Sequence, residues 1–115
     1  MPFKSHSEYI KKAPAAVRPI LAAIQAEVET LLPRAERCIG YNMPAYKAGR
    51  TFFYFAAFKK HIGIYPPVKR DKALIKALSP YRGPKGNLSF PLDRPLPLEL
   101  IGKVAVALHR EYEAG

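Results

Sequence analysis

Aromatic hydroxyls and positive charges gather in the middle of this sequence, and together they indicate recognition of an anion. Tyr41, Tyr46, Tyr65 and Tyr81 each flank a turn, where a ring can pack while its hydroxyl faces a cleft. Aromatic rings stack on planar ligands, whereas lysine and arginine hold phosphates and carboxylates. The residues that we expect to form a ligand-binding surface are Tyr41, Asn42, Tyr46, Lys59, Lys60, His61, Tyr65, Arg82 and Lys85.

The excess of positive charge is confined to the middle of the chain. The 115 residues include 19 lysines and arginines and nine aspartates and glutamates, which gives a formal net charge of +10. Residues 33–86 hold twelve of these basic residues and only two acids, Glu36 and Asp71, whereas the flanks hold seven of each sign. If the segment forms one face, its positive potential attracts an anionic small molecule, a nucleic acid or an acidic partner protein. A scatter of solvated lysines on turns is the alternative.

Motifs for covalent catalysis and for phosphate loops are absent from the sequence. It has no Gly-x-Ser-x-Gly elbow and no glycine-rich loop of the Walker or Rossmann type. Glu27 and Glu29 lie two residues apart on an expected helix, so they point to different sides and cannot act as a catalytic pair. We therefore expect a binding protein rather than an enzyme.

Potential metal ligands are scattered along the chain, and no resident cofactor is expected. The histidines at positions 6, 61 and 109 are far apart, and Cys38 is the single cysteine. His109 and Glu113 lie four residues apart on an expected helix, which is more typical of a solvated surface than of a metal site.

A single cysteine cannot form an internal disulfide, and the first 20 residues lack an apolar signal core, so we expect a cytoplasmic protein.

Length and hydrophobic spacing predict a single α+β domain over residues 1–115. About two-thirds of the surface of a chain of this size is buried on folding, and no stretch approaches the ~20 apolar residues that a membrane span requires. Tight turns between adjacent strands make the sheet antiparallel, in a two-layer domain packed against helices. The expected order, α-β-β-β-α-β-α, comprises a helix over about 14–32, strands over 37–41, 51–58 and 61–65, a helix over 69–78, a strand over 88–90 and a helix from residue 98.

The connections between these elements are also predicted. Ser5 or Ser7 caps a short opening turn, and Pro19 makes a kink early in the long first helix. Residues 42–49 form a turn-rich stretch, and Lys59-Lys60 forms a hairpin tip. Tyr112 belongs to the buried stripe of the last helix.

Several strings of residues resemble the YdhG-like family of small bacterial domains. They are Ile39–Tyr46, Phe53–Pro66, Lys85–Asp93 and the Pro95-Leu96-Pro97 segment that precedes the closing helix. The resemblance covers about residues 9–111 and implies a compact α+β domain with an antiparallel sheet packed on helices, similar to frataxin.

The same resemblance implies an alternative function, because one branch of the family is described as an intracellular iron chaperone. Frataxin-like iron binding uses carboxylates along the first helix, assisted by histidine. The residues that this role would use here are Glu27, Glu29, His109 and Glu113. Because a strongly positive chain repels cations at long range, we rank the binding of an anion first.

Overall fold

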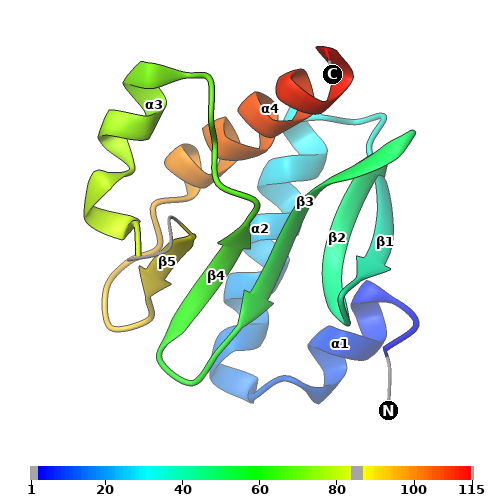
Figure 1. The fold of residues 1–115 in the computed structure, drawn as a ribbon. Coiled ribbons are helices and arrows are strands. Elements are labelled where there is room, and N and C mark those ends of the chain that lie inside the picture. Colours follow the sequence, from blue (N-terminus) through cyan, green and yellow to red (C-terminus); the bar gives the residue numbers. More distant parts are fainter. Residues whose placement is uncertain (1–2, 84–86, 115) are drawn as a thin grey trace.

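A five-stranded antiparallel sheet forms the centre of the fold, with helices packed on one of its faces (Figure 1). The computed structural model describes residues 3–83 and 87–114. None of the described helices is long and apolar enough to cross a membrane. The helices are α1 (His6–Lys12), α2 (Arg18–Leu31), α3 (Lys72–Ala77) and α4 (Leu98–Ala114), with 3-10 turns at Ala15–Val17 and Ser79–Tyr81. The strands are β1 (Glu36–Gly40), β2 (Met43–Ala48), β3 (Arg50–Ala57), β4 (His61–Tyr65) and β5 (Leu88–Pro91), and they neighbour one another in that order.

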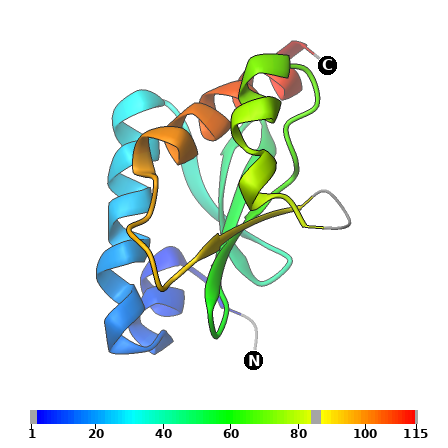
Figure 2. The ribbon, with the colours of Figure 1, turned by 90° about the vertical axis from the view of Figure 1, so that its left-hand side faces the viewer.

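The core lies between the sheet and the helices α2 and α4. Figure 2 shows α2 on one side of the sheet, and no described helix crosses the opposite face. Side chains of a strand alternate between the two faces, and the large apolar ones point toward the helices. The fully buried side chains of this core include Phe53, Phe55, Ile62, Ile64 and Phe90 from the sheet, Leu21, Ile24 and Val28 from α2, and Ile101, Val104 and Leu108 from α4.

A bulge in β3 lets two consecutive phenylalanines enter this core. Tyr46 of β2 pairs with Phe53, but Lys47 pairs with Thr51, so Phe52 has no partner in β2. An extra residue of this kind bends a strand and re-aims its side chains. Phe52 is buried, and its ring lies edge-on to the ring of His109 in α4, with centroids 5.1 Å apart. The bulge therefore explains why apolar residues run continuously along this strand instead of alternating.

Most expected elements are confirmed, but the expected order is wrong. The stretch 42–49 contains the strand β2, because its turn formers Asn42, Pro44 and Gly49 lie at or near its ends while the residues between them pair on both sides. Four strands, not three, therefore precede α3, and two helices, not one, precede β1. Pro19 lies in the first turn of α2 and does not kink a longer helix, since a missing N–H costs no helical bond there.

Gly49 supplies a test of the turn between β2 and β3. Its φ is +83°, a left-handed conformation that costs a residue with a Cβ about 1–2 kcal/mol, although no atom lies within 4 Å of the Cβ position. Gly49→Ala should therefore lower the free energy of unfolding by about 1 kcal/mol in urea titrations followed by circular dichroism. Gly83→Ala is the control, because its φ lies outside the left-handed region and its nearest neighbours lie at an ordinary 3.5 Å. Equal losses in the two variants would contradict this account of the turn.

Candidate ligand site on the open face of the sheet

The face of the sheet turned away from the helices is covered by aromatic rings that lie over small residues. Alternation places Tyr54 of β3 and its cross-strand partner Tyr65 of β4 on this face. Ala56 and Gly63 form the next pair on the same face. A Cβ on Gly63 would lie 2.7 Å from the Tyr65 hydroxyl and 2.8 Å from the Phe58 ring, so both rings extend over the glycine. In place of a helix, the rings themselves shield this part of the sheet.

Four tyrosines from separate parts of the chain surround one pocket on this face. Tyr41 comes from the turn between β1 and β2, Tyr54 from β3, Tyr65 from β4 and Tyr112 from α4. The pocket has a volume of about 410 Å³, and Met43 and Pro66 complete its lining. This volume lies within the range of about 300–1,000 Å³ that is usual for small-molecule sites.

The turn between β1 and β2 presents the Tyr41 ring to solvent. Tyr41 and Asn42 have φ angles of 51° and 61°, as the two central residues of a type I′ hairpin turn do. Asparagine tolerates this conformation well, whereas a large residue such as tyrosine rarely adopts it. The Tyr41 side chain is 85% exposed, although its ring centroid lies only 5.6 Å from that of Tyr54. One ring surface of Tyr41 is therefore free to contact a ligand.

Glycine and a positive charge shape the rest of the pocket. A Cβ on Gly40 would lie 2.6 Å from the Tyr54 ring, so the glycine lets this ring lie against the end of β1. The guanidinium carbon of Arg50 lies 5.7 Å from the centroid of the Tyr112 ring, within cation–π range. Lys47 is exposed, and alternation from Ala45, the partner of Tyr54, places it on the same face. The pocket thus has a cation at its edge.

The hydroxyl of Tyr54 is suited to donate a hydrogen bond to an anion. Burial raises its pKa, and the neighbouring hydroxyls of Tyr41 and Tyr112 raise it further. The Tyr54 side chain is therefore a neutral phenol at neutral pH. A neutral phenol does not repel an anionic ligand, and its O–H can donate to a phosphate or carboxylate oxygen.

The structure brings only some of the expected tyrosines together. Tyr41 and Tyr65 line the pocket, whereas Tyr81 lies near β5, where the centroid of its ring is 4.8 Å from that of Phe90. Tyr46 is fully buried on the helix side of the sheet, so its hydroxyl cannot reach a ligand on the open face. Asn42 follows Tyr41 in the turn, and its Oδ1 accepts a hydrogen bond from the backbone N–H of Phe3 at 2.6 Å.

Three residues that we expected in the ligand-binding surface, Lys59, Lys60 and His61, do not line the pocket. Lys59 and Lys60 form the tip, as predicted, and the backbone N–H of Phe58 donates to the carbonyl of His61. The rings of Phe58 and His61 stack with centroids 4.9 Å apart. This stacked pair is a second aromatic feature of the open face, at the end of β4 opposite to Tyr65.

The positive residues of the middle segment do not all lie on one face. Arg37 points to the helix side of the sheet, where it pairs with Glu29, and Arg70 lies beside α3 and α4. Arg82 forms an isolated bridge with Leu88 at the start of β5. Lys85 lies outside the described residues. Arg37 therefore lies on the helix side of the sheet and Arg70 lines a different hollow, so these two residues do not share one cationic surface with the tyrosine pocket.

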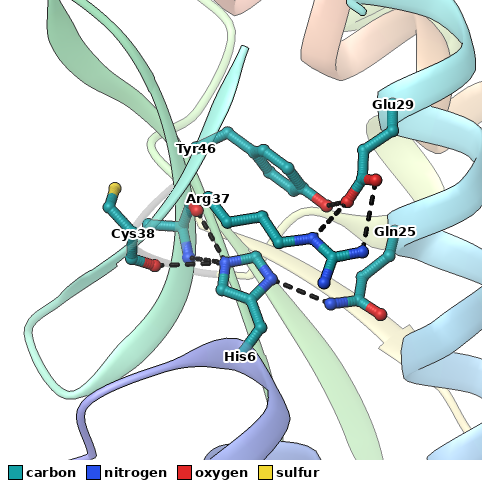
Figure 3. Close-up of polar contacts among 7 residues, drawn as sticks. His6, Gln25, Glu29, Arg37, Cys38 and Tyr46 are labelled. Carbon is teal, nitrogen blue, oxygen red and sulfur yellow. Dashed lines mark hydrogen bonds and ion pairs between the residues drawn. The ribbon is translucent and has the colours of Figure 1, made fainter.

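Tyr46 belongs to a partly buried polar network that the sequence analysis missed (Figure 3). Its hydroxyl donates to Oε2 of Glu29 at 2.6 Å, and Arg37 donates to the same carboxylate from Nε at 2.6 Å and from Nη2 at 3.2 Å. The bonds from Arg37 lower the pKa of Glu29, and burial raises the pKa of Tyr46. The network joins the hairpin of β1 and β2 to α2.

His6 of α1 forms further hydrogen bonds to β2 and to α2. Ser5 caps the helix, as predicted, with its Oγ accepting the N–H of Glu8 at 3.1 Å. The His6 side chain is 2% exposed, and its Nε2 lies 2.8 Å from the carbonyl oxygen of Ala45 while its Nδ1 lies 2.9 Å from Nε2 of Gln25. A neutral ring satisfies both contacts if Nε2–H donates to the carbonyl and Gln25 donates to Nδ1. Burial lowers the pKa of His6, which agrees with this neutral form.

The residues named for iron binding are not gathered into one site. Glu29 belongs to the network above, Glu27 lies against Gly102 of α4, and His109 packs beside the bulge of β3. The side chain of Glu113 lies outside the description. Over the described parts of the chain, no three His, Cys, Asp or Glu residues lie close enough to share a metal ion.

Comparisons with known proteins agree on the fold. The family model described as a domain of unknown function (DUF5655) matches residues 6–83, more than half of the chain. The crystal structure of YdhG from Bacillus subtilis, a protein of the DUF1801 family, has a TM-score of 0.75 and 19% sequence identity, covering 93% of this chain and 90% of that chain. An uncharacterised conserved protein from Lactobacillus casei has a TM-score of 0.50 and 18% identity, covering 96% of this chain and 95% of that chain. A comparison with curated proteins gave no match. The YdhG-like fold expected from the sequence is thereby confirmed.

The buried histidine predicts a pH dependence of stability. His6 has a lowered pKa in the folded protein and a pKa near 6.5 when unfolded, so the unfolded chain binds the proton more readily. Its contribution to stability is complete above about pH 6.5 and is lost as the pH falls below that value. Glu29 acts in the same direction, but only as the pH falls below about 4.5.

Urea unfolding between about pH 7.5 and about pH 5.5 isolates the contribution of His6. The free energy of unfolding should fall with pH in the wild type and fall less steeply in His6→Gln, which cannot titrate at this position. The control is His61→Gln, which makes the same substitution in the β3–β4 hairpin outside the network; an equal change of slope in the two variants would contradict the assignment to His6. An unchanged slope in His6→Gln would show that His6 titrates alike in the folded and unfolded states.

Proposed function

This chain belongs to the family described as a domain of unknown function (DUF5655), and we propose that it binds a nucleotide-sized planar anion in the tyrosine pocket. The observation that carries the proposal is the convergence of Tyr41, Tyr54, Tyr65 and Tyr112 around one hollow of about 410 Å³. These rings come from the β1–β2 turn, from β3, from β4 and from α4.

The chemistry of the pocket favours a flat ring as the central part of the ligand. Four of the six lining residues are tyrosines, and their neighbours are Met43 and Pro66. Stacking of a nucleobase on an aromatic side chain contributes about 1–3 kcal/mol and accepts every base. Tyr41 offers an exposed ring surface for this contact, and the Tyr54 ring lies beside it.

The polar groups around the pocket favour a negatively charged ligand. Arg50 at the edge contributes a permanent positive charge, and the protonated hydroxyl of Tyr54 contributes a hydrogen-bond donor. A guanidinium binds phosphate with paired hydrogen bonds. An open hollow of this volume suits a mononucleotide better than a polymer, which would require an extended cationic groove.

A binding role agrees with the groups that line the pocket. None of the six lining residues is Ser, Cys, His, Asp or Glu, the types that most often serve as nucleophiles or general bases. The proposal is therefore one of capture and release, without a chemical step.

Iron delivery is the alternative proposal, and it rests on the resemblance to the frataxin-like branch of the YdhG-like family. Its test is an anaerobic titration with ferrous iron, followed by the NMR signals of Glu27, Glu29 and His109. Saturable paramagnetic broadening at these residues would favour iron. Broadening that is spread over the whole surface would reject it.

Removal of the exposed ring tests the stacking contact. Tyr41→Asn deletes the ring while keeping a residue that tolerates the positive φ of the turn. Affinity for nucleoside monophosphates, measured by calorimetry, should fall by roughly 5- to 150-fold, which corresponds to a loss of about 1–3 kcal/mol of stacking. The thermal stability should stay near that of the wild type, because the side chain is 85% exposed.

The matched control for this variant is Phe58→Ser, which removes a ring that is 43% exposed on the same chain but does not line the pocket. It should bind nucleoside monophosphates as the wild type does. If Tyr41→Asn and Phe58→Ser have the same affinity as the wild type, the pocket is not the binding site.

Replacement of the edge cation tests the charge preference. Arg50→Gln should weaken binding of a nucleoside monophosphate by roughly tenfold but leave the uncharged nucleoside nearly unaffected, because only the phosphate needs the cation. Lys60→Gln at the hairpin tip serves as the charge-matched control. Tighter binding of short single strands than of monophosphates, with a loss in Lys60→Gln, would instead indicate a polymer ligand that extends along the open face.

A further inference from the structure

A second hollow lies between α3 and α4, and it shares no lining residue with the tyrosine pocket. It has a volume of about 780 Å³, and it is lined by residues of α3, of the two positions before α3, of α4 and of the end of α2. Part of its floor is formed by the small side chains of Ala73, Ala77 and Ala107, which leave the space between the two helices open. We call it the α3–α4 groove.

The two ends of the α3–α4 groove differ in chemistry. The carboxylate of Glu111 accepts the backbone N–H groups of Lys69 and Arg70 at 3.0–3.3 Å, which places the start of α3 beside the C-terminal half of α4. Arg70 and Arg110 therefore lie toward this end of the groove. Leu100, one of its apolar lining residues, lies ten residues before Arg110 on α4, so a helical rise of 1.5 Å per residue separates them by roughly 15 Å.

The acids of the groove accept hydrogen bonds from backbone N–H groups, whereas its arginines form no ion pair with a described side chain. Asp71 caps α3 by accepting the N–H of Leu74 at 3.0 Å, and Glu111 holds the backbone before α3. Among the side chains that the structure describes, neither Arg70 nor Arg110 forms an ion pair. Lys103, midway along the groove, lies 3.9 Å from Glu99, and both side chains are largely exposed.

From this arrangement we infer that the α3–α4 groove is a binding site for a small amphipathic anion, a medium-chain alkyl carboxylate. The carboxylate head would lie between the two guanidinium groups, which bind such groups with paired hydrogen bonds. The alkyl chain would follow the apolar floor toward Leu100 and Leu31, a residue whose side chain is 45% exposed at the end of α2. Coverage of these apolar side chains gives the hydrophobic part of the binding free energy.

Charge complementarity decides between this ligand and other apolar molecules. A neutral amphiphile would leave the two guanidinium groups without a partner, and a cationic head would meet three cations, Arg70, Lys103 and Arg110, against two acids, Asp71 and Glu111. A polar anion such as acetate would use the arginines but not the apolar floor. The site requires both parts of the ligand, and this requirement is the basis of its test.

The test is an NMR titration of the full chain with decanoate below the concentration at which it forms micelles. Saturable shifts should appear at the methyl groups of Ala73, Ala77 and Val106. Decyltrimethylammonium, which has the same chain and the opposite charge, and acetate, which lacks the chain, should each bind at least roughly tenfold more weakly. Equal binding of the two decyl compounds would overturn the proposal.

Variants of the groove make the test specific. The double variant Arg70→Gln/Arg110→Gln should weaken decanoate by roughly tenfold or more, whereas Lys72→Gln/Lys76→Gln removes the same charge from α3 outside the lining and should bind as the wild type does. Ala77→Phe fills the groove from an exposed position of α3 and should abolish saturable binding. Equal affinities in the two charge variants would contradict the site.

The outcome is independent of the function proposed for the tyrosine pocket. Tyr41→Asn should leave decanoate affinity unchanged, and nucleoside monophosphates should not displace decanoate. Displacement would show one shared site and would overturn the proposal of a separate groove.

Discussion

The fully buried aromatic and aliphatic side chains of the central strands pack on one face of the sheet, and the rest of the structure depends on this asymmetry. Phe53 and Phe55 are fully buried between the sheet and the helices, so alternation turns Tyr54 to the opposite face. The bulge adds Phe52 to the core side without moving Tyr54, because the extra residue lies before the pair that Tyr54 makes with Ala45. With no described helix over the open face, tyrosines fit there, since a ring can cover the sheet while its hydroxyl meets water.

The polar network on the helix side contributes to the open face indirectly. Tyr46 and Arg37 come from β2 and β1, and both bind Glu29 of α2. His6 is bonded to the carbonyl oxygen of Ala45 in the same hairpin. These contacts hold the hairpin whose tip carries Tyr41, so the network supports one wall of the pocket although its residues do not line the pocket.

The sequence predicts the fold class well, because it depends on patterns that are local. The stripe of α2, the hairpin at Lys59-Lys60 and the cap at Ser5 all follow from neighbouring residues. Prediction failed at β2, because Pro44 and Gly49 are read as turn formers although pairing on both sides makes the segment a strand. Local sequence does not show such pairing partners.

The pocket could be predicted only in part for the same reason. Tyr41 and Tyr65 were identified from their positions beside turns, whereas Tyr54 was hidden in an aromatic run and Tyr112 in a helical stripe. The cross-strand pair of Tyr54 and Tyr65 was available as a signal once the hairpin register was counted from its tip. No local signal places Tyr112 near them, because that contact depends on how α4 crosses the end of the sheet.

The most direct test of the central claim is a set of intermolecular NOEs between the base protons of a nucleoside monophosphate and the tyrosine rings of the protein. The chain has seven tyrosines and four of them line the pocket, so the set of rings that give NOEs distinguishes the pocket from other sites. The account predicts NOEs to the rings that line the pocket and none to Tyr9, Tyr46 and Tyr81. A bound nucleotide with NOEs to Tyr81, or with none to Tyr41 and Tyr54, would contradict the claim that the open face of the sheet is the ligand site.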